Sequence, residues 1–258
     1  MMYVKELGRK EAPTVVFLHG GGVSGWMWQR QADYFKDYRL LIPDLPGHGN
    51  SREEPFTTMQ ETAAALIEIL EEKAEGQKVH LIGFSLGAQL GVEILSQAPQ
   101  LLQSAILLSP LVRPFGTGKG MMDAAIKMCY GLMKNRQFQK LQAKVLYIGE
   151  EYFEQYFEDV KNTSLEDLRS YMNANMSYKL PETFKDHQVR TLVLAGCKEK
   201  SVMRQSAADL VHSNRYCIGY EIPGVGHGVS LADPELFNRL VKAWLEEKAL
   251  PEKLITIK

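Results

Sequence analysis

The sequence predicts an α/β fold in which helices cover both faces of a mostly parallel sheet. Six short runs rich in aliphatic and β-branched residues alternate with longer helical patterns, which is the order that produces parallel strands joined by helices. Several of these runs are apolar at consecutive positions, as strands covered on both faces are. The chain has 258 residues, 45% of them hydrophobic, so it can bury a sizeable core. The expected strands are residues 14–18, 39–42, 78–82, 105–108, 190–194 and 216–222.

The helical patterns complete this alternation. The last of them begins with Asp233 as N-cap and Pro234 at the first helical position, a strong start signal. Asp233 is therefore explained by capping. The expected helices lie near residues 26–36, 59–74, 86–97, 202–211 and 234–247.

One segment interrupts the alternation. Residues 111–184 contain helical patterns rich in methionine and aromatic residues, and no convincing pair of strands. We expect a helical cap there, inserted into a core made of residues 1–110 and 185–258. Its large side chains either seal the cap against the core or line an adaptable apolar pocket, and both interpretations stay open.

Charge, hydropathy and cysteine content indicate which partners, compartment and metal sites are to be expected. Lys and Arg total 30 against 31 Asp and Glu, and no long run has a single sign, so nothing favours nucleic acid or an anionic membrane as partner. No window approaches the roughly 18 apolar residues that a membrane span needs. The N-terminal residues do not resemble a secretory signal. Cys129, Cys197 and Cys217 are expected to be buried thiols of a cytoplasmic protein, and the spacing of the histidines predicts no metal site.

The stretch GFSLG, residues 83–87, places a serine at the end of an apolar run. A serine in a tight strand-to-helix turn adopts an unusual backbone conformation, and Gly83 and Gly87 remove the side chains that would clash with it. The first N–H groups of the following helix face the hydroxyl and can stabilise negative charge beside it. Ser85 is therefore the candidate nucleophile.

A serine hydroxyl is a poor nucleophile without a base. His227 is the candidate base because it lies between two glycines, after the last strand and before the final helix. An imidazole base needs a carboxylate that fixes its tautomer. Glu199 follows a strand in the right region and is the candidate acid, whereas Asp186 precedes that strand and Asp209 falls inside a helix.

The order serine, glutamate, histidine along the chain resembles that of the α/β-hydrolase family, and the likeness covers nearly the whole chain. Besides the elbow at residues 83–87, the HGGG motif at residues 19–22 looks like the family's oxyanion loop. The turn DLPGHGNS, residues 44–51, is similar to the family's D-x-P-G-H-G-x-S turn. His19 and His48 within these motifs are expected to hold loops together.

The resemblance implies an oxyanion hole formed by the backbone N–H groups of Gly21 and Leu86, with Gly22 as the alternative donor. It also implies a cap after the sixth strand, which matches residues 111–184. The family more often has aspartate where this chain has Glu199, so the identity of the acid is the open point. A serine nucleophile argues against members that use aspartate. What remains is acyl chemistry on esters, thioesters or amides, together with C–C hydrolases and lyases that share a serine triad. A carboxylesterase-like activity without a cofactor is the favoured expectation. The apolar cap suggests a small-molecule substrate with an apolar acyl group.

Two other interpretations remain. Residues 20–25, GGGVSG, fit a dinucleotide-binding pattern with Asp44 at the expected distance. Against it, residues 26–28 are bulky where a helix should pack closely, and Ser85 and His227 are left without a role. The second alternative is a protein of the same fold that binds a small molecule without turning it over.

Overall fold

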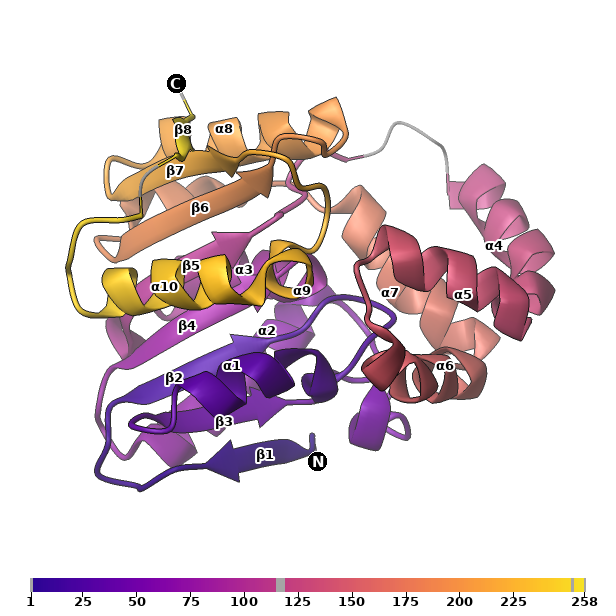
Figure 1. The fold of residues 1–258 in the computed structure, drawn as a ribbon, viewed down its shortest axis with the longest axis horizontal. Coiled ribbons are helices and arrows are strands. Elements are labelled where there is room, and N and C mark those ends of the chain that lie inside the picture. The colour runs from indigo at the N-terminus through magenta and orange to yellow at the C-terminus, as the bar shows by residue number, and fades with distance from the viewer. Residues whose placement is uncertain (1, 115–118, 252, 258) are drawn as a thin grey trace.

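The centre of the protein is an eight-stranded sheet, seen in the computed structural model, which describes residues 2–114, 119–251 and 253–257 (Figure 1). The strand order is β1-β3-β2-β4-β5-β6-β7-β8. The strands are β1 (Val4–Leu7), β2 (Thr14–Leu18), β3 (Arg39–Pro43), β4 (Val79–Phe84), β5 (Leu102–Leu108), β6 (Arg190–Gly196), β7 (Cys217–Ile222) and β8 (Ile255–Thr256).

The six inner strands are parallel, and β1 and β8 pair antiparallel at the two edges. Their register aligns Phe17, Ile82, Ile106, Leu192 and Ile218 in one row across five strands. Because side chains alternate along a strand, such a row presents apolar groups to a single face of the sheet. The predicted α/β class with a mostly parallel sheet is confirmed.

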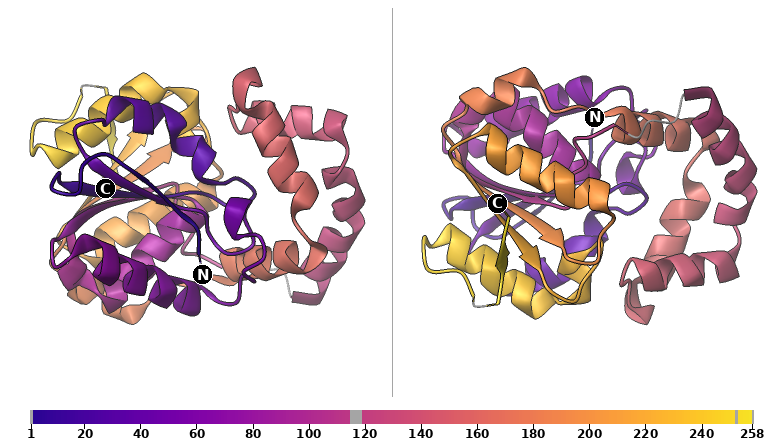
Figure 2. Two further views of the ribbon diagram at one scale, coloured as in Figure 1. Left: turned by 90° about the horizontal axis from the view of Figure 1, so that it is seen from below. Right: turned by 90° about the horizontal axis from the view of Figure 1, so that it is seen from above.

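Two layers of helices cover the sheet (Figures 1 and 2). One apolar cluster joins one face of the sheet to α1 (Gln29–Tyr34), α9 (Val229–Ala232) and α10 (Pro234–Leu245). A second cluster joins the other face to α2 (Met59–Ala74), α3 (Leu86–Gln97) and α8 (Ser201–Ser213). Alternate residues of each inner strand contribute to the two clusters, which explains why these strands are apolar throughout.

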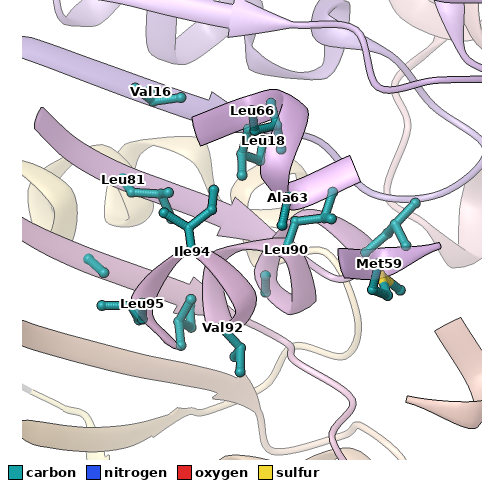
Figure 3. Packing of buried hydrophobic residues seen from close by; sticks show 14 of the residues in the cluster. Val16, Leu18, Met59, Ala63, Leu66, Leu81, Leu90, Val92, Ile94 and Leu95 are labelled. Carbon is teal, nitrogen blue, oxygen red and sulfur yellow. The ribbon is translucent and has the colours of Figure 1, made fainter. Parts of the chain in front are cut away.

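Helix α3 packs closely against the sheet, and Figure 3 shows its Ile94 beside Leu81 of β4. A β-carbon at Gly91 would lie 2.9 Å from Leu81 Cδ2, so the glycine permits this approach. Each fully buried aliphatic side chain of this kind stabilises the fold by about 1.5–3 kcal/mol. The helix that follows Ser85 is therefore a rigid support.

Among the described residues, four α-helices occupy the segment between β5 and β6. They lie beyond the carboxyl ends of the inner strands, beside the sheet and not on its faces (Figures 1 and 2). The helical pattern predicted there is confirmed for the described residues, while the division into core and cap stays a prediction. The helices are α4 (Lys119–Met133), α5 (Arg136–Val145), α6 (Phe153–Asn162) and α7 (Leu165–Ser177).

Helix α6 contacts the core through Trp26, whose indole N–H donates to Asp159 Oδ2 at 2.7 Å. The Trp26 ring also stacks on Tyr152, with ring centroids 5.7 Å apart. Burial, reinforced by the charge of Asp44, raises the pKa of Asp159 to about 6 although the bond from Trp26 opposes the shift. The ionised carboxylate is therefore less stable in the folded protein than in the unfolded chain.

Because the pKa of Asp159 is raised on folding, its contribution to stability is complete below pH 4 and is lost as the pH rises through 6. We expect Asp159→Asn to raise the free energy of unfolding at pH 8 by up to about 3 kcal/mol, since each pKa unit corresponds to about 1.4 kcal/mol. At pH 4 the gain should vanish. Urea unfolding at both pH values measures the difference, and Glu158→Gln, on the exposed side of the same helix, is the matched control. An equal effect of Asp159→Asn at the two pH values would contradict the prediction.

The three thiols differ in exposure. Cys217 is buried and Cys197 is half-buried, whereas Cys129 is exposed, so the prediction of a buried thiol is wrong for Cys129. Its place on α4 explains the difference, because Ile126 takes the buried position of that turn.

None of the helices in the described ranges combines the length and apolar character that crossing a bilayer requires.

Candidate active site

Ser85 lies in the turn that joins β4 to α3, as predicted. Its φ of 53° and ψ of −111° fall in a region that residues with a β-carbon rarely adopt. A β-carbon at Gly83 would lie 2.3 Å from the carbonyl oxygen of Gly87, and one at Gly87 would lie 2.3 Å from that of Leu18. Since neither clash can be relieved without moving backbone, both glycines are required by the turn.

The HGGG loop, residues 19–22, lies beside the turn that carries Ser85. A β-carbon at Gly20 would be 3.4 Å from Ser85 Cβ, and one at Gly21 would be 3.8 Å from Leu86 Cδ2, so the HGGG loop borders the elbow. Among the described residues, the N–H groups of Gly21 and Leu86 make no backbone hydrogen bond of the turn, loop or cap type. Gly22 has a φ of 77° in the same loop. The predicted oxyanion donors Gly21 and Leu86 thus lie on two segments that border each other at this turn.

Glu199 lies three residues beyond the end of β6, and its side chain is 1% exposed. Its Oε1 accepts hydrogen bonds from the hydroxyl of Ser109 and, at 3.1 Å, from the N–H of Gly196. Ser109 directly follows β5 and has a φ of 54°, while its own N–H donates to the carbonyl of Leu194 at 2.7 Å. Donors from two neighbouring strand ends therefore fix one carboxylate oxygen.

The second carboxylate oxygen faces the histidine. Glu199 Oε2 is 3.7 Å from His227 Nδ1, and no residue in the described ranges gives this oxygen a hydrogen bond. The distance is that of a charge contact and exceeds hydrogen-bond length. The His227 ring also packs against Phe84, with centroids 4.8 Å apart, and its side chain is 32% exposed.

Burial alone would raise the pKa of Glu199. The neighbouring His227 and the bonds from Ser109 and Gly196 outweigh burial, so the pKa of this carboxyl lies below its ordinary value. Glu199 is thus ionised at neutral pH and can stabilise a positive charge on the imidazole.

Ser85, Glu199 and His227 line one cavity of about 490 Å³. The structure thus brings the three predicted residues together at one cavity. Seven of the other eleven lining residues come from the segment between β5 and β6, and three of the eleven are methionines. The other lining residues are Leu111, Val145, Leu146, Tyr147, Met172, Asn175, Met176, Lys198, Lys200, Met203 and Gly226.

The two histidines of the loop motifs are buried and structural. His19 Nε2 accepts from the N–H of Leu45 at 2.8 Å, which places its proton on Nδ1, and Nδ1 donates to the carbonyl of Gly20 at 2.8 Å. His48 Nδ1 bonds the carbonyl of Pro46 at 2.8 Å. Burial lowers the pKa of both rings, that of His48 to about 3. Both rings are neutral and hold loops, as the sequence predicted.

The dinucleotide interpretation fails on Asp44. Its Oδ1 accepts from the N–H of Gly25 at 2.7 Å, and its Oδ2 accepts from the N–H and side-chain amide of Asn50 at 2.8 and 2.9 Å. The side chain is buried and joins two loops, so it offers no oxygen to a ribose. Elsewhere in the described ranges, no three His, Cys, Asp or Glu side chains gather as metal ligands.

Two residues of the site, Ser109 and Tyr147, were not predicted from the sequence. Ser109 donates a hydrogen bond to Glu199. Its position could have identified it, because a polar residue that directly follows the predicted strand 105–108 lies at the sheet edge where the parallel strands end and the site is located. Tyr147 accepts a hydrogen bond from the N–H of Gly226 at 3.0 Å, next to His227. Nothing in the local sequence marks Tyr147, since its partner is 79 residues away.

Comparison with known proteins agrees with this architecture. Residues 15–240 match the alpha/beta hydrolase family. A Pantoea ananatis protein named "Putative carbamate hydrolase RutD" is 28% identical, over 96% of this chain and 94% of its own. A pimeloyl-[acyl-carrier protein] methyl ester esterase of Methylococcus capsulatus is 32% identical over 42% of this chain and 40% of its own.

Among solved structures, a hydrolase from Pseudomonas aeruginosa superimposes with a TM-score of 0.79. It is 20% identical, and the alignment covers 95% of this chain and 94% of that one, which supports the fold. The family match spans most of the 258 residues. This chain is therefore a member of the α/β hydrolase family.

Proposed function

We propose that this protein is a serine hydrolase that cleaves a carboxylic ester through an acyl-enzyme. The observation that carries the proposal is the 3.7 Å contact between Glu199 Oε2 and His227 Nδ1, at a cavity that Ser85 also lines. A buried ionised carboxylate, an imidazole and a serine on a strand-to-helix turn are the groups that acyl transfer needs.

In the first half-reaction, Ser85 Oγ attacks the acyl carbon while His227 Nε2 takes the hydroxyl proton. The carbonyl oxygen becomes an oxyanion, to which the N–H groups of Gly21 and Leu86 donate. Glu199 orients the imidazole and stabilises its positive charge. When the tetrahedral intermediate collapses, the bond to the leaving oxygen breaks, and that oxygen takes the proton from His227 and departs as an alcohol.

In the second half-reaction, water replaces the alcohol. His227 Nε2 takes a proton from the water as its oxygen attacks the acyl carbon, and the same N–H groups hold the oxyanion. Collapse of this intermediate breaks the bond to Ser85 Oγ, which regains its proton from His227. A carboxylic acid leaves, and the enzyme returns to its starting state.

We assign the acyl group to the apolar part of the cavity, formed by Leu111, Met172, Met176 and Met203. Under this proposal residues 111–184 are a cap on a core of residues 1–110 and 185–258. The relatives named as a methyl ester esterase and a carbamate hydrolase support a small-molecule acyl substrate.

A fluorophosphonate probe tests the proposal. It should label the wild-type protein covalently at Ser85, and Ser85→Ala should lose the label. Ser96→Ala, on the same helix but with its hydroxyl bonded to Val92, should be labelled like wild type. An unlabelled wild type would favour a binding protein without turnover.

A matched series of ester, thioester and amide substrates with increasing acyl length then identifies the bond and the acyl group. We expect the highest kcat/KM for esters with apolar acyl chains. Equal turnover of short charged esters with none of apolar ones would contradict the apolar assignment.

A further inference from the structure

Tyr147 combines an unusual backbone with a contact to the histidine loop. It lies just after α5, and its φ of 58° is in the left-handed region, which is uncommon for a residue with a large side chain. Its phenol oxygen accepts a hydrogen bond from the N–H of Gly226 at 3.0 Å. Tyr147 also lines the cavity with Ser85 and His227.

The contact extends to both sides of the histidine. A β-carbon at Gly226 would lie 3.3 Å from the phenol oxygen of Tyr147. One at Gly228 would lie 3.3 Å from the carbonyl oxygen of Leu146 and 3.8 Å from the Tyr147 ring. The chain between α5 and α6 therefore touches the residue before His227 and the residue after it.

Non-glycine residues with a positive φ are concentrated at this site. Among the described residues other than glycine, six have a positive φ, and three of these, Ser85, Ser109 and Tyr147, belong to the site or hold a part of it. Ser109 bonds Glu199, and Tyr147 bonds the loop of His227. A backbone of this kind persists where surrounding contacts impose it, and such positions cluster at functional sites.

We propose that Tyr147 is a positioning residue by which the helical segment completes the catalytic site. Its phenol oxygen holds the N–H of Gly226, and so fixes His227 relative to Glu199 and Ser85. The inference rests on the proposed hydrolase function. It means that the histidine is correctly placed only when the chain after α5 is seated against its loop.

The first test is Tyr147→Phe, which keeps the ring and removes the hydrogen-bond acceptor. We expect kcat to fall about 10- to 100-fold, the range typical of residues that orient a reacting group. KM should stay within about twofold, because the ring remains in the cavity wall. The rate of fluorophosphonate labelling should fall with kcat, while the melting temperature stays close to that of wild type. Tyr152→Phe makes the same chemical change outside the cavity and should leave all four quantities unchanged.

A double-mutant cycle tests whether Tyr147 acts through the loop. Gly226 does not have a positive φ, so Gly226→Ala is free of backbone strain, but its new methyl group would press on the phenol oxygen at 3.3 Å. We expect Gly226→Ala to lower kcat in the wild-type background and to change it much less in the Tyr147→Phe background. Additive effects of the two substitutions would contradict action through Gly226.

The outcomes separate the two proposals. An active, labelled wild type with kcat within twofold of that of Tyr147→Phe would overturn the positioning role alone. A wild type that neither hydrolyses esters nor takes up the probe would overturn the hydrolase function, and the positioning role with it.

Discussion

Ser85→Ala is expected to lower kcat by about a million-fold, the loss typical of removing a catalytic serine. The hydroxyl is the only part of the side chain that changes, and an alanine methyl group fits the same positive φ no worse than serine does. The N–H groups of Gly21 and Leu86 remain, so residual turnover of about a thousand-fold over water is expected. Steady-state hydrolysis of the best ester in the series measures the effect.

The control is again Ser96→Ala, which should keep wild-type kcat. Thermal unfolding of Ser85→Ala should match wild type, because the turn depends on Gly83 and Gly87 and not on the hydroxyl. If Ser85→Ala retained more than about a hundredth of the wild-type kcat, another group would be the nucleophile.

Under the proposed function, Glu199→Gln is expected to lower kcat by about ten-thousand-fold, the loss typical of replacing the carboxylate of a serine protease triad by an amide. The bonds from Ser109 and Gly196 favour an amide oxygen at the Oε1 position. The amide nitrogen would then take the Oε2 position and point an N–H at His227 Nδ1. This selects the tautomer with its proton on Nε2, which cannot accept the proton of Ser85.

Because the tautomer itself is wrong, the loss should persist at every pH between 6 and 9. Glu221→Gln is the matched control, since Glu221 lies nearby on β7, pairs with Arg204 and does not line the cavity. It should stay within a few-fold of wild type. Near-normal turnover of Glu199→Gln would place the orienting group elsewhere.

Most of the inner strands and the helices that cover the sheet could be predicted from local patterns in the sequence. The strand at residues 14–18 and the helices at 59–74 and 86–97 have the bounds that the sequence predicted, because apolar runs and end signals coincide there. The edge strands β1 and β8 were missed. An edge strand has a neighbouring strand on one side only and can therefore carry charged or exposed residues. β1, with the sequence VKEL, has two charged residues, and β8 consists of two exposed residues, so neither shows the apolar run of an inner strand.

The candidate site was only partly predictable. Ser85 and His227 lie in turns whose glycines leave a visible signature, and a carboxylate was expected near the end of β6. The partners of these residues depend on which strand ends are neighbours. Ser109 reaches Glu199 because β5 and β6 are adjacent in the sheet, and Tyr147 reaches Gly226 because the chain after α5 folds back over the strand ends. Such distant contacts leave no periodic trace in the sequence.

The cavity wall has two origins, with different consequences for how the protein can diversify. Ser85, Glu199 and His227 come from strand ends that the buried core makes rigid, whereas Met172 and Met176 come from α7. Substitutions at the two methionines can reshape the chamber without touching the bonds that hold Glu199. Under the proposed function, such substitutions would change which substrates fit while leaving the three reacting groups in place, whereas a change at Tyr147 would also affect the loop of His227.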